Sequence, residues 1–342
     1  MTARAFISGL SGVAITHDEA RFLREARPWG LILFRRNIDN PSQVKALTAH
    51  FRDILGWQAP VLVDQEGGRV QRLGPPHWPS YPPGAAYARL YGQDPSSGLE
   101  AARLGGRLIG EDLAALGIDV DCVPVADVPV DGADAVIGDR AFGTTPDQVG
   151  ALAGAQAEGV MAAGVLPVVK HLPGHGRATA DSHLKLPVVD TDRATLEATD
   201  FAAFRTLSSL PLGMTAHVVF SAIDPANPAT TSAIMIRDVI RGSIGFEGLL
   251  MSDDVSMGAL SGALSERSRD ALAAGCDLVL HCNGNLDEMR DVAEAAPLLS
   301  GEAAARADRA LALRQRREPI DLAAARARFS DLMSRVSAGA IA

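Results

Sequence analysis

The feature that most constrains this chain is a regular alternation of short apolar runs with longer segments of helical periodicity. We expect eight strands, at residues 5–8, 30–34, 60–64, 118–125, 166–170, 212–217, 248–252 and 277–281. Several of these runs are apolar at nearly every position, which is typical of parallel strands that are covered on both faces. The pattern therefore predicts an α/β protein built on a parallel sheet.

The segments between the apolar runs carry helix signals. Residues 41–55 and 98–116 each place large apolar side chains at helical spacing. Asn40 followed by Pro41 is typical of a helix start, because asparagine caps free N–H groups and proline suits the first turn. We therefore expect helices to alternate with the strands along the chain.

Eight strands, each leading to a helix, predict a (β/α)8 TIM barrel, here as a single domain of 342 residues. After Gly301 the sequence becomes rich in alanine and arginine, and we expect residues 302–342 to form one or two closing helices. The alternative is an open, doubly wound sheet. Against it, no glycine-rich dinucleotide fingerprint follows the first apolar run, since the segment 9–12 is too short and too isolated.

Charge and hydropathy exclude several classes of protein. The chain has 32 Lys and Arg against 41 Asp and Glu, a formal net charge of −9, so we expect no nucleic-acid partner. No apolar run approaches the roughly 20 residues that cross a bilayer. Polar residues interrupt the N-terminal apolar stretch, which argues against a secretory signal. We therefore expect a cytoplasmic protein with no membrane partner.

The three cysteines, Cys122, Cys276 and Cys282, are too few for a disulfide framework in a chain of this length. Free cysteine is among the most frequently buried residue types. We therefore expect all three to be buried small apolar side chains.

Polar residues stand where five of the apolar runs end. They are residues 64–69 after the run 60–63, Lys170 and His171 after 167–169, His217 after 212–216, Asp253 and Asp254 after 248–252, and residues 281–283 after 278–280. One charged strand end is usually a solvated terminus. In a parallel barrel, however, all these ends meet on one rim, where barrel enzymes place their catalytic residues. Five such ends together favour a functional site.

The densest group of ionisable residues lies in the segment 170–183, which contains three histidines together with Lys170 and Asp181. Pro173 and two nearby glycines argue against a continuous helix or strand, and glycine permits the backbone to approach a ligand closely. Each histidine taken alone could be structural. Because they are concentrated directly after an apolar run, we interpret the segment as a functional loop.

Two chemistries fit this loop. The first is metal-assisted hydrolysis, with His171, His175, His183 and a carboxylate as ligands. His171 and His175 are four residues apart, which suits two ligands on a helix, but Pro173 and Gly174 argue against a helix there.

The second chemistry is acid/base catalysis by a histidine that a carboxylate orients, with another carboxylate as nucleophile. Asp181 and His183 are two residues apart, so their side chains share a face of an extended segment. An anionic aspartate beside a histidine stabilises the imidazolium ion and selects the ring tautomer.

The segments 170–176 (KHLPGHG) and 181–183 (DSH) resemble the signature of bacterial exo-β-N-acetylglucosaminidases of glycoside hydrolase family 3. Further matches lie at 63–72, 138–142 and 251–257, and all of them keep their order along most of the chain. Many members have a second domain that this chain lacks, so it resembles the compact, single-barrel branch used in peptidoglycan recycling. Residues 177–180 fall where relatives vary, and the resemblance implies no conformation for them.

The resemblance implies that Asp253 is the nucleophile, that His183 is the general acid/base and that Asp181 orients His183. The choice of Asp253 over the adjacent Asp254 rests on the motif alignment. The resemblance also implies contacts to the sugar from Asp64, Arg72, Arg140, Lys170 and His171. On residue type alone, the two arginines could also form surface salt bridges.

The resemblance further implies a retaining exo-β-N-acetylglucosaminidase that needs no metal or organic cofactor. Its expected partner is a small carbohydrate, N-acetylglucosamine joined to anhydro-muramic acid with or without peptide, and the resemblance implies no oligomeric state. Three alternatives stay open: a related β-glycosidase or one that transfers the sugar to phosphate, a metal-dependent hydrolase that uses the same histidines, and a sugar-binding protein without catalysis.

Overall fold

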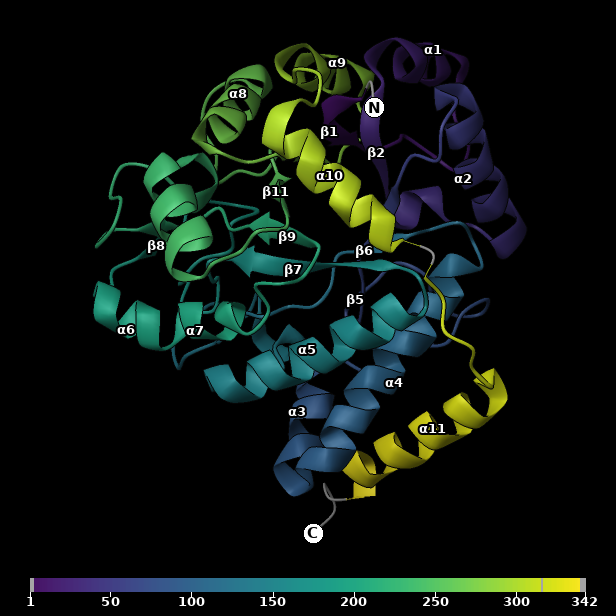
Figure 1. Ribbon diagram of the computed structural model, residues 1–342, viewed down its shortest axis with the longest axis vertical. Coiled ribbons are helices and arrows are strands. Elements are labelled where there is room, and N and C mark those ends of the chain that lie inside the picture. The colour runs from purple at the N-terminus through teal and green to yellow at the C-terminus, as the bar shows by residue number, and fades with distance from the viewer. Residues whose placement is uncertain (1–2, 315, 339–342) are drawn as a thin grey trace.

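In the computed structural model, which describes residues 3–314 and 316–338, eight parallel strands close into a barrel surrounded by helices (Figure 1). Their order around the barrel is β1-β12-β11-β9-β7-β6-β3-β2. The barrel strands are β1 (Arg4–Ser8), β2 (Pro28–Leu33), β3 (Val61–Val63), β6 (Val120–Asp121), β7 (Leu166–Leu172), β9 (Leu212–Thr215), β11 (Leu249–Asp254) and β12 (Leu278–His281). The TIM-barrel prediction is confirmed, and closure of the barrel excludes the open sheet.

All eight expected strands form, and one of them is much shorter than predicted. The run 118–125 contributes only β6 to the barrel. Pro124 lies inside this run and has no backbone N–H, so it cannot donate to a neighbouring strand. Its carbonyl still accepts the N–H of Lys170 at 3.0 Å, which keeps the segment beside β7.

Both faces of the barrel strands are buried, and alternate residues serve two different clusters. Ile7, Leu62 and Val168 point into the barrel and pack with one another. Phe6 and Val169, one position along their strands, belong to the larger cluster between the barrel and its helices. This arrangement accounts for the nearly continuous apolar sequence of the runs.

Helices follow the strands in sequence. They are α1 (His17–Ala26), α2 (Pro41–Leu55), α3 (Gly84–Gln93), α4 (Pro95–Ala114), α5 (Pro146–Ala162), α6 (Arg193–Ala198), α7 (Asp200–Arg205), a π-helical segment (Met235–Ser243), α8 (Leu264–Ala274), α9 (Leu286–Ala295), α10 (Gly301–Leu313) and α11 (Leu322–Ala338). Two small sheets lie outside the barrel: antiparallel β4 (Gln65–Gly67) with β5 (Val70–Gln71), and parallel β8 (Val188–Val189) with β10 (Val219–Phe220).

The helix-start signals predict the helix boundaries well where they were read. Helix α2 spans the predicted residues, and the side chain of Asn40 accepts the N–H of Gln43 at 3.0 Å. Helix α4 begins three residues before the expected 98 because Asp94 and Pro95 form the same cap-and-proline pair. The capping chemistry thus decides where both helices begin.

The last two helices pack in different places (Figure 1). Helix α10 supplies Ala307 and Ala310 to the cluster that also contains Ala3 and Leu278, so it covers the amino ends of the strands. Helix α11 instead packs against α3 and α4 at the side of the barrel. The carboxyl ends of the strands are therefore the open end of the barrel.

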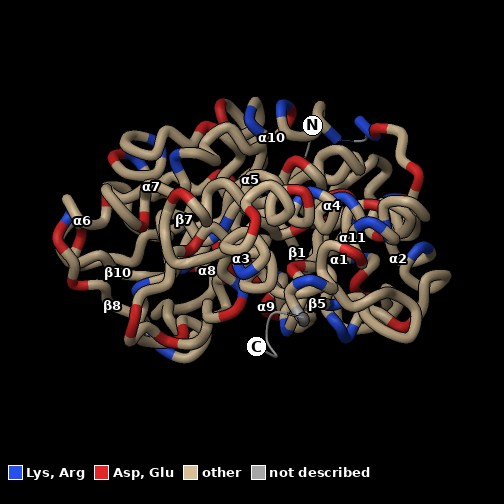
Figure 2. Tube along the Cα trace, turned by 90° about the horizontal axis from the view of Figure 1, so that it is seen from below, with Lys and Arg blue, Asp and Glu red and all other residues tan. Residues whose placement is uncertain are grey.

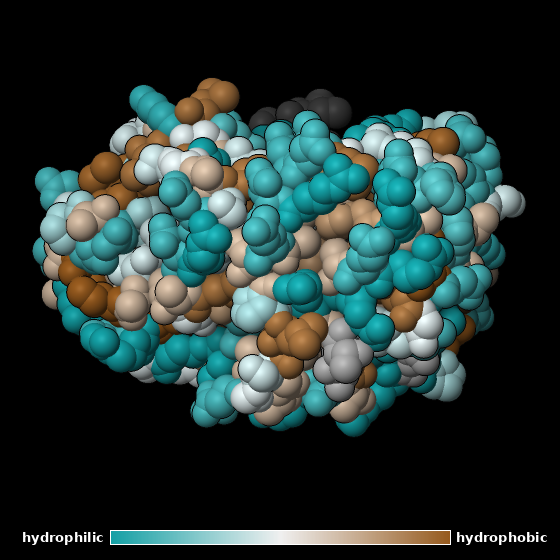
Figure 3. All heavy atoms as spheres, turned by 90° about the horizontal axis from the view of Figure 1, so that it is seen from above, coloured by the Kyte–Doolittle hydropathy of each residue, from teal (hydrophilic) through white to brown (hydrophobic). Residues whose placement is uncertain are grey.

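The surface carries both signs of charge, and blue and red positions alternate around the periphery in Figure 2. The face shown in Figure 3 is mainly hydrophilic, with apolar side chains in small separate groups. Among the described residues, no helix has the length and apolar character that crossing a bilayer requires.

The cysteine prediction is right for two residues and wrong for the third. Cys122 and Cys276 are buried, whereas Cys282 is partly exposed. Cys282 directly follows β12, at the open end of the barrel, and its exposure results from that position.

Candidate active site

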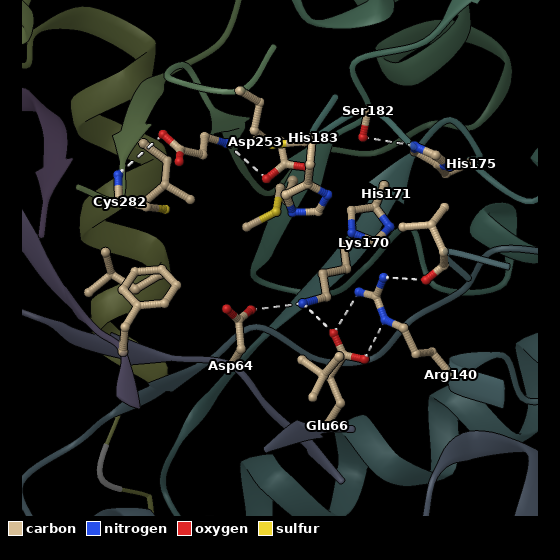
Figure 4. A pocket seen from close by; sticks show the side chains of 18 of the residues that line it. Asp64, Glu66, Arg140, Lys170, His171, His175, Ser182, His183, Asp253 and Cys282 are labelled. Carbon is tan, nitrogen blue, oxygen red and sulfur yellow. Dashed lines mark hydrogen bonds and ion pairs between the residues drawn. The ribbon is translucent and has the colours of Figure 1, made fainter. Parts of the chain in front are cut away.

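A cavity of about 440 Å³ opens at the carboxyl ends of the barrel strands (Figure 4). All eight residues that the resemblance assigns to the site line it: Asp64, Arg72, Arg140, Lys170, His171, Asp181, His183 and Asp253. Four of them, Asp64, Lys170, His171 and Asp253, also stand at polar strand ends, so that interpretation predicted the place of the cavity.

Different parts of the fold supply these side chains. Asp64 directly follows β3, Lys170 and His171 belong to β7, and Asp253 belongs to β11. Arg72 follows the β4–β5 hairpin, and Arg140 ends a 3₁₀ turn (Gly138–Arg140) between β6 and α5. Asp181 and His183 lie in the loop between β7 and β8. Three of the eight residues thus lie in barrel strands, and the other five lie in the segments that connect the strands and helices.

Lys170 lies at the centre of a buried ionic cluster. Its Nζ is 2.9 Å from Oδ1 of Asp64 and 2.7 Å from Oε1 of Glu66 (Figure 4). Arg140 pairs with both carboxylate oxygens of Glu66, each at 2.8 Å. Arg72 contacts Asp64 at 2.9 Å. The cluster therefore presents fixed donors and acceptors to the cavity rather than loose surface ion pairs.

The cluster keeps its members charged although they are buried. Burial disfavours the charged forms, but Asp64 and Glu66 raise the pKa of Lys170 above its ordinary value. Lys170 and Arg72 in turn hold the pKa of Asp64 well below its usual range, against the effect of burial. Lys170 and Arg140 likewise lower the pKa of Glu66, again against burial. Hydrogen-bonding groups of both charges are thus present at neutral pH.

The fully buried carboxylate of Asp127 contacts the His171 ring on the side away from the cavity. Nδ1 of the ring lies 2.7 Å from Oδ2 of Asp127, so Nε2 is the ring nitrogen left for the cavity. Oδ1 of Asp127 accepts the backbone N–H of His175 at 2.6 Å. Burial opposes ionisation of Asp127, but the His171 ring overcomes it and lowers the pKa of Asp127. The same carboxylate thus orients the ring and anchors the beginning of the loop.

Asp253 is placed differently from its neighbour Asp254. Both oxygens of Asp254 are engaged: Oδ2 accepts the Ser256 hydroxyl at 2.7 Å, and Oδ1 accepts the N–H groups of Ser256 and Cys282. Within the described chain, the carboxylate of Asp253 accepts one hydrogen bond, from the Asp254 N–H to Oδ1 at 2.8 Å. Oδ2 of Asp253 is therefore the oxygen available for another atom.

The environment of Asp253 favours its anionic form. Burial acts against ionisation, but the His217 and His171 rings, the Asp254 N–H and Lys170 outweigh it and lower the pKa of Asp253. A carboxylate with one free oxygen and no proton can act as a nucleophile or as an electrostatic partner of a developing cation.

Asp181 and His183 form a pair at the mouth of the cavity. Nδ1 of His183 lies 2.7 Å from Oδ1 of Asp181, and 63% of the His183 side-chain surface is exposed. The pKa of Asp181 is lowered by the His183 N–H and ring, although partial burial acts against this. With Nδ1 occupied, Nε2 is the ring atom that can exchange a proton with a ligand.

Nε2 of His175 is engaged within the protein and is therefore not available to a ligand in the cavity. It lies 3.0 Å from the Ser182 hydroxyl, which ties the two ends of the loop together (Figure 4). Burial and the adjacent His171 lower the pKa of His175, so the ring is neutral at pH 7. Within residues 3–314 and 316–338, no three His, Cys, Asp or Glu side chains are arranged to hold a metal ion.

Two histidines of the polar strand ends lie outside the cavity lining, although Cys282 and Asn283, which follow His281, are part of it. His217 is fully buried, and its Nε2 donates to the Asp254 carbonyl at 2.9 Å. His281 is also fully buried, and its Nε2 lies 3.1 Å from Glu288. Both rings contact the elements around the cavity instead of its contents.

The sequence interpretation missed Glu66 and Asp127. Glu66 lies within the matched segment 63–72, but no residue pattern indicates that it pairs with Arg140, 74 positions away. Asp127 lies two residues after the apolar run 118–125, so the rule that selected the other strand ends, extended by two positions, could have found it.

Residues 5–313 match the family described as "Glycosyl hydrolase family 3 N terminal domain". The match spans the whole barrel and α10.

Curated relatives share the chain's length as well as its sequence. A beta-hexosaminidase of Alkalilimnicola ehrlichii is 42% identical over 279 residues, which cover 80% of this chain and 79% of that protein. A beta-hexosaminidase of Neisseria gonorrhoeae is 38% identical over 292 residues, covering 83% and 80%.

Among solved structures, NagZ from Neisseria gonorrhoeae in complex with N-trifluoroacetyl-D-glucosamine superposes with a TM-score of 0.84. It is 32% identical, and the superposition covers 99% of this chain and 98% of that one. The fold described above is thus the fold of that protein.

Proposed function

This chain belongs to glycosyl hydrolase family 3, and from that membership we propose that it is an exo-β-N-acetylglucosaminidase. It would release terminal, non-reducing N-acetylglucosamine with retention of configuration at the anomeric carbon. The observation that carries the proposal is one cavity that holds an anionic aspartate with a free oxygen, Asp253, together with the Asp181–His183 pair.

The first step forms a glycosyl-enzyme. Oδ2 of Asp253 attacks the anomeric carbon while the bond from that carbon to the leaving-group oxygen breaks through an oxocarbenium-like transition state. Nε2 of His183 donates its proton to the departing oxygen. Asp181 holds the ring by Nδ1 throughout, so the proton leaves from the nitrogen that faces the substrate.

The second step regenerates the enzyme. Nε2 of His183, now without its proton, takes one from a water molecule, and the water oxygen attacks the anomeric carbon. The ester bond to Asp253 breaks, and the sugar leaves with the configuration it had in the substrate. A neutral imidazole also places no second anion opposite Asp253, as a carboxylic acid/base pair would.

The ionic cluster fits the recognition of sugar hydroxyl groups. Lys170 and Arg72 offer N–H donors and Asp64 offers acceptor oxygens, all held by mutual pairing. His171 adds the Nε2 side of a ring fixed by Asp127. Since these partners are positioned before substrate binds, little side-chain entropy is lost on binding.

We further propose that the substrate is a cell-wall fragment, N-acetylglucosamine joined to anhydro-muramic acid with or without peptide, and that the reaction takes place in the cytoplasm. The support is the resemblance to the single-barrel branch of the family. The fact that curated relatives of matching length are named beta-hexosaminidases agrees with it.

The test is to trap the covalent intermediate. The enzyme is incubated with a fluorinated N-acetylglucosamine analogue, and the labelled peptide is mapped by mass spectrometry. We expect a label on Asp253 and none in Asp253→Asn. A label on another residue refutes the nucleophile assignment, and inversion of the anomer seen by NMR refutes the two-step mechanism.

A panel of chromogenic glycosides decides the sugar and the acceptor. We expect β-N-acetylglucosaminides to be cleaved far faster than β-glucosides or β-xylosides, with free N-acetylglucosamine as product in phosphate buffer. Formation of a sugar 1-phosphate would instead assign a phosphate-transferring activity, and loss of activity in EDTA would favour the metal-dependent alternative.

A further inference from the structure

The loop that follows Asp253 is bonded directly to the backbone of the Asp181–His183 segment. The N–H of Gly258 donates to the carbonyl of His183 at 3.1 Å, and the N–H of Ala259 donates to the carbonyl of Ser182 at 3.2 Å. These contacts join a segment four residues after β11 to a loop that begins more than 70 positions earlier.

Only glycine fits at position 258 in this arrangement. A Cβ atom there would lie 2.9 Å from the carbonyl oxygens of both His183 and Leu184, closer than carbon and oxygen pack. Gly258 does not have the left-handed backbone conformation, so the requirement comes from the close approach and not from φ. Both obstructing atoms are backbone atoms, which cannot turn aside as a side chain can.

The segment after β11 has more contacts with the rest of the protein than the His183 segment has. Arg267 donates to the carbonyls of Val255 and Met257 at 2.9 and 3.2 Å, and the N–H of Val255 donates to Leu280. The loop after β11 is thereby fixed to α8 and β12. On the other side, His183, Leu184 and the two residues after them are exposed. Any added bulk at 258 therefore displaces the acid/base side.

We propose that Gly258 is a positioning residue, which sets the distance between the nucleophile and the acid/base histidine through these two backbone hydrogen bonds. The inference rests on the proposed roles of Asp253 and His183. Gly258 contacts the backbone of His183 and acts on the reaction only through it. The His175–Ser182 bond holds the inner side of the same loop, so the His183 segment is fixed at two points.

The experiment compares Gly258→Ala with Gly92→Ala. Gly92 lies in α3, where an added Cβ would meet no atom within 4 Å, so its variant controls for the loss of a glycine. For each protein, kcat/KM is measured on two β-N-acetylglucosaminides, one with a nitrophenyl leaving group and one with a sugar leaving group. kcat/KM reports the first step, in which the acid protonates the leaving oxygen.

We expect Gly258→Ala to lower kcat/KM for the sugar leaving group by at least about tenfold and for the nitrophenyl group by less than about threefold. The ratio of the two values cancels any difference in the amount of folded enzyme, because both substrates are measured on one preparation. A purely structural role would lower both values equally and leave the ratio unchanged. Gly92→Ala should show the ratio of the parent enzyme.

His183→Ala is the reference that separates this inference from the proposed function. If His183→Ala changes the ratio and Gly258→Ala does not, the positioning role of Gly258 is overturned while the proposed function stands. If neither variant changes the ratio, the acid/base assignment of His183 is overturned, and the inference built on it is overturned as well.

Discussion

A single oxygen of Asp181 holds both the ring and the backbone of His183. Oδ1 lies 2.7 Å from Nδ1 of the imidazole, and it accepts a hydrogen bond from the backbone N–H of the same residue at 2.9 Å. The geometry of the pair is therefore set by contacts among three consecutive residues. The distance of the pair from Asp253, by contrast, depends on contacts between the β7–β8 loop and the segment after β11.

We predict that the acid/base pair can be impaired in two separable ways. His183→Ala should lower kcat/KM for a sugar leaving group by about 10²–10⁴-fold. An activated aryl leaving group needs little protonation and should be much less affected. Asp181→Asn keeps an acceptor oxygen beside Nδ1 of His183, so it should lower kcat/KM for the sugar leaving group less than Asp181→Ala, which removes that acceptor. Equal losses in the two variants would contradict the orienting role.

We predict that Asp253→Ala lowers kcat by at least about 10³-fold on every substrate, because the proposed mechanism needs Oδ2 of Asp253 to attack the anomeric carbon. The control is Asp291→Ala, since Asp291 is an exposed residue of α9. Steady-state rates on an aryl glycoside measure the effect. An Asp253→Ala variant with near-parental rates contradicts the nucleophile assignment.

We predict that the acid limb of kcat/KM lies below about pH 4, the ordinary pKa of an aspartate. The pKa of Asp253 is lowered by the neighbouring rings, the Asp254 N–H and Lys170 in spite of burial, so its carboxylate stays ionised as the pH falls through that value. Initial rates at low substrate between pH 3 and 8, with a check that the enzyme recovers on return to pH 7, measure it. An acid limb above pH 5 would contradict the prediction.

We predict that Lys170→Met destabilises the fold by about 3–5 kcal/mol at pH 7, because two buried carboxylates lose their shared cation. Arg21→Met is the control, since the exposed Arg21–Asp18 pair should contribute less than about 0.5 kcal/mol. Urea denaturation gives the two free energies of unfolding. The lowered pKa values of Asp64 and Glu66 mean that their ion pairs stabilise the fold above about pH 4. The loss caused by Lys170→Met should therefore shrink below that pH.

We predict that Asp121→Asn stabilises the fold at pH 7 by about 1–3 kcal/mol, because asparagine keeps the acceptor for the Gln65 N–H and has no ionisable group that must hold a proton in the folded state. Burial raises the pKa of Asp121 well above its ordinary value, and its Oδ2 has no hydrogen-bond partner among the described residues. The folded protein thus retains a proton that the unfolded chain releases above about pH 4, so Asp121 lowers stability as pH rises. The gain from the variant should grow between pH 4 and 7. A gain that is absent or independent of pH would contradict this.

The features that the sequence predicted are those that depend on neighbouring residues. Apolar runs with both faces buried, the cap at Asn40 that begins α2, and the Asp181–His183 pair two positions apart are all local patterns. The barrel followed from them because parallel strands joined by helices have few ways to close. Polar residues at strand ends then had to share one rim.

Contacts between distant segments were decided only by the tertiary structure. No local pattern indicates that Glu66 pairs with Arg140 and Lys170, or that His217 is buried beneath the loop that follows Asp253. No local pattern indicates that position 258 requires glycine either. The requirement comes from the carbonyl groups of His183 and Leu184, which precede Gly258 by more than 70 residues. The sequence by itself determined which chemical groups reach the open end of the barrel. The packing of one loop against another decided which of them are charged, oriented and close enough to act together, because distances across a site are set by backbone contacts that no sequence periodicity records.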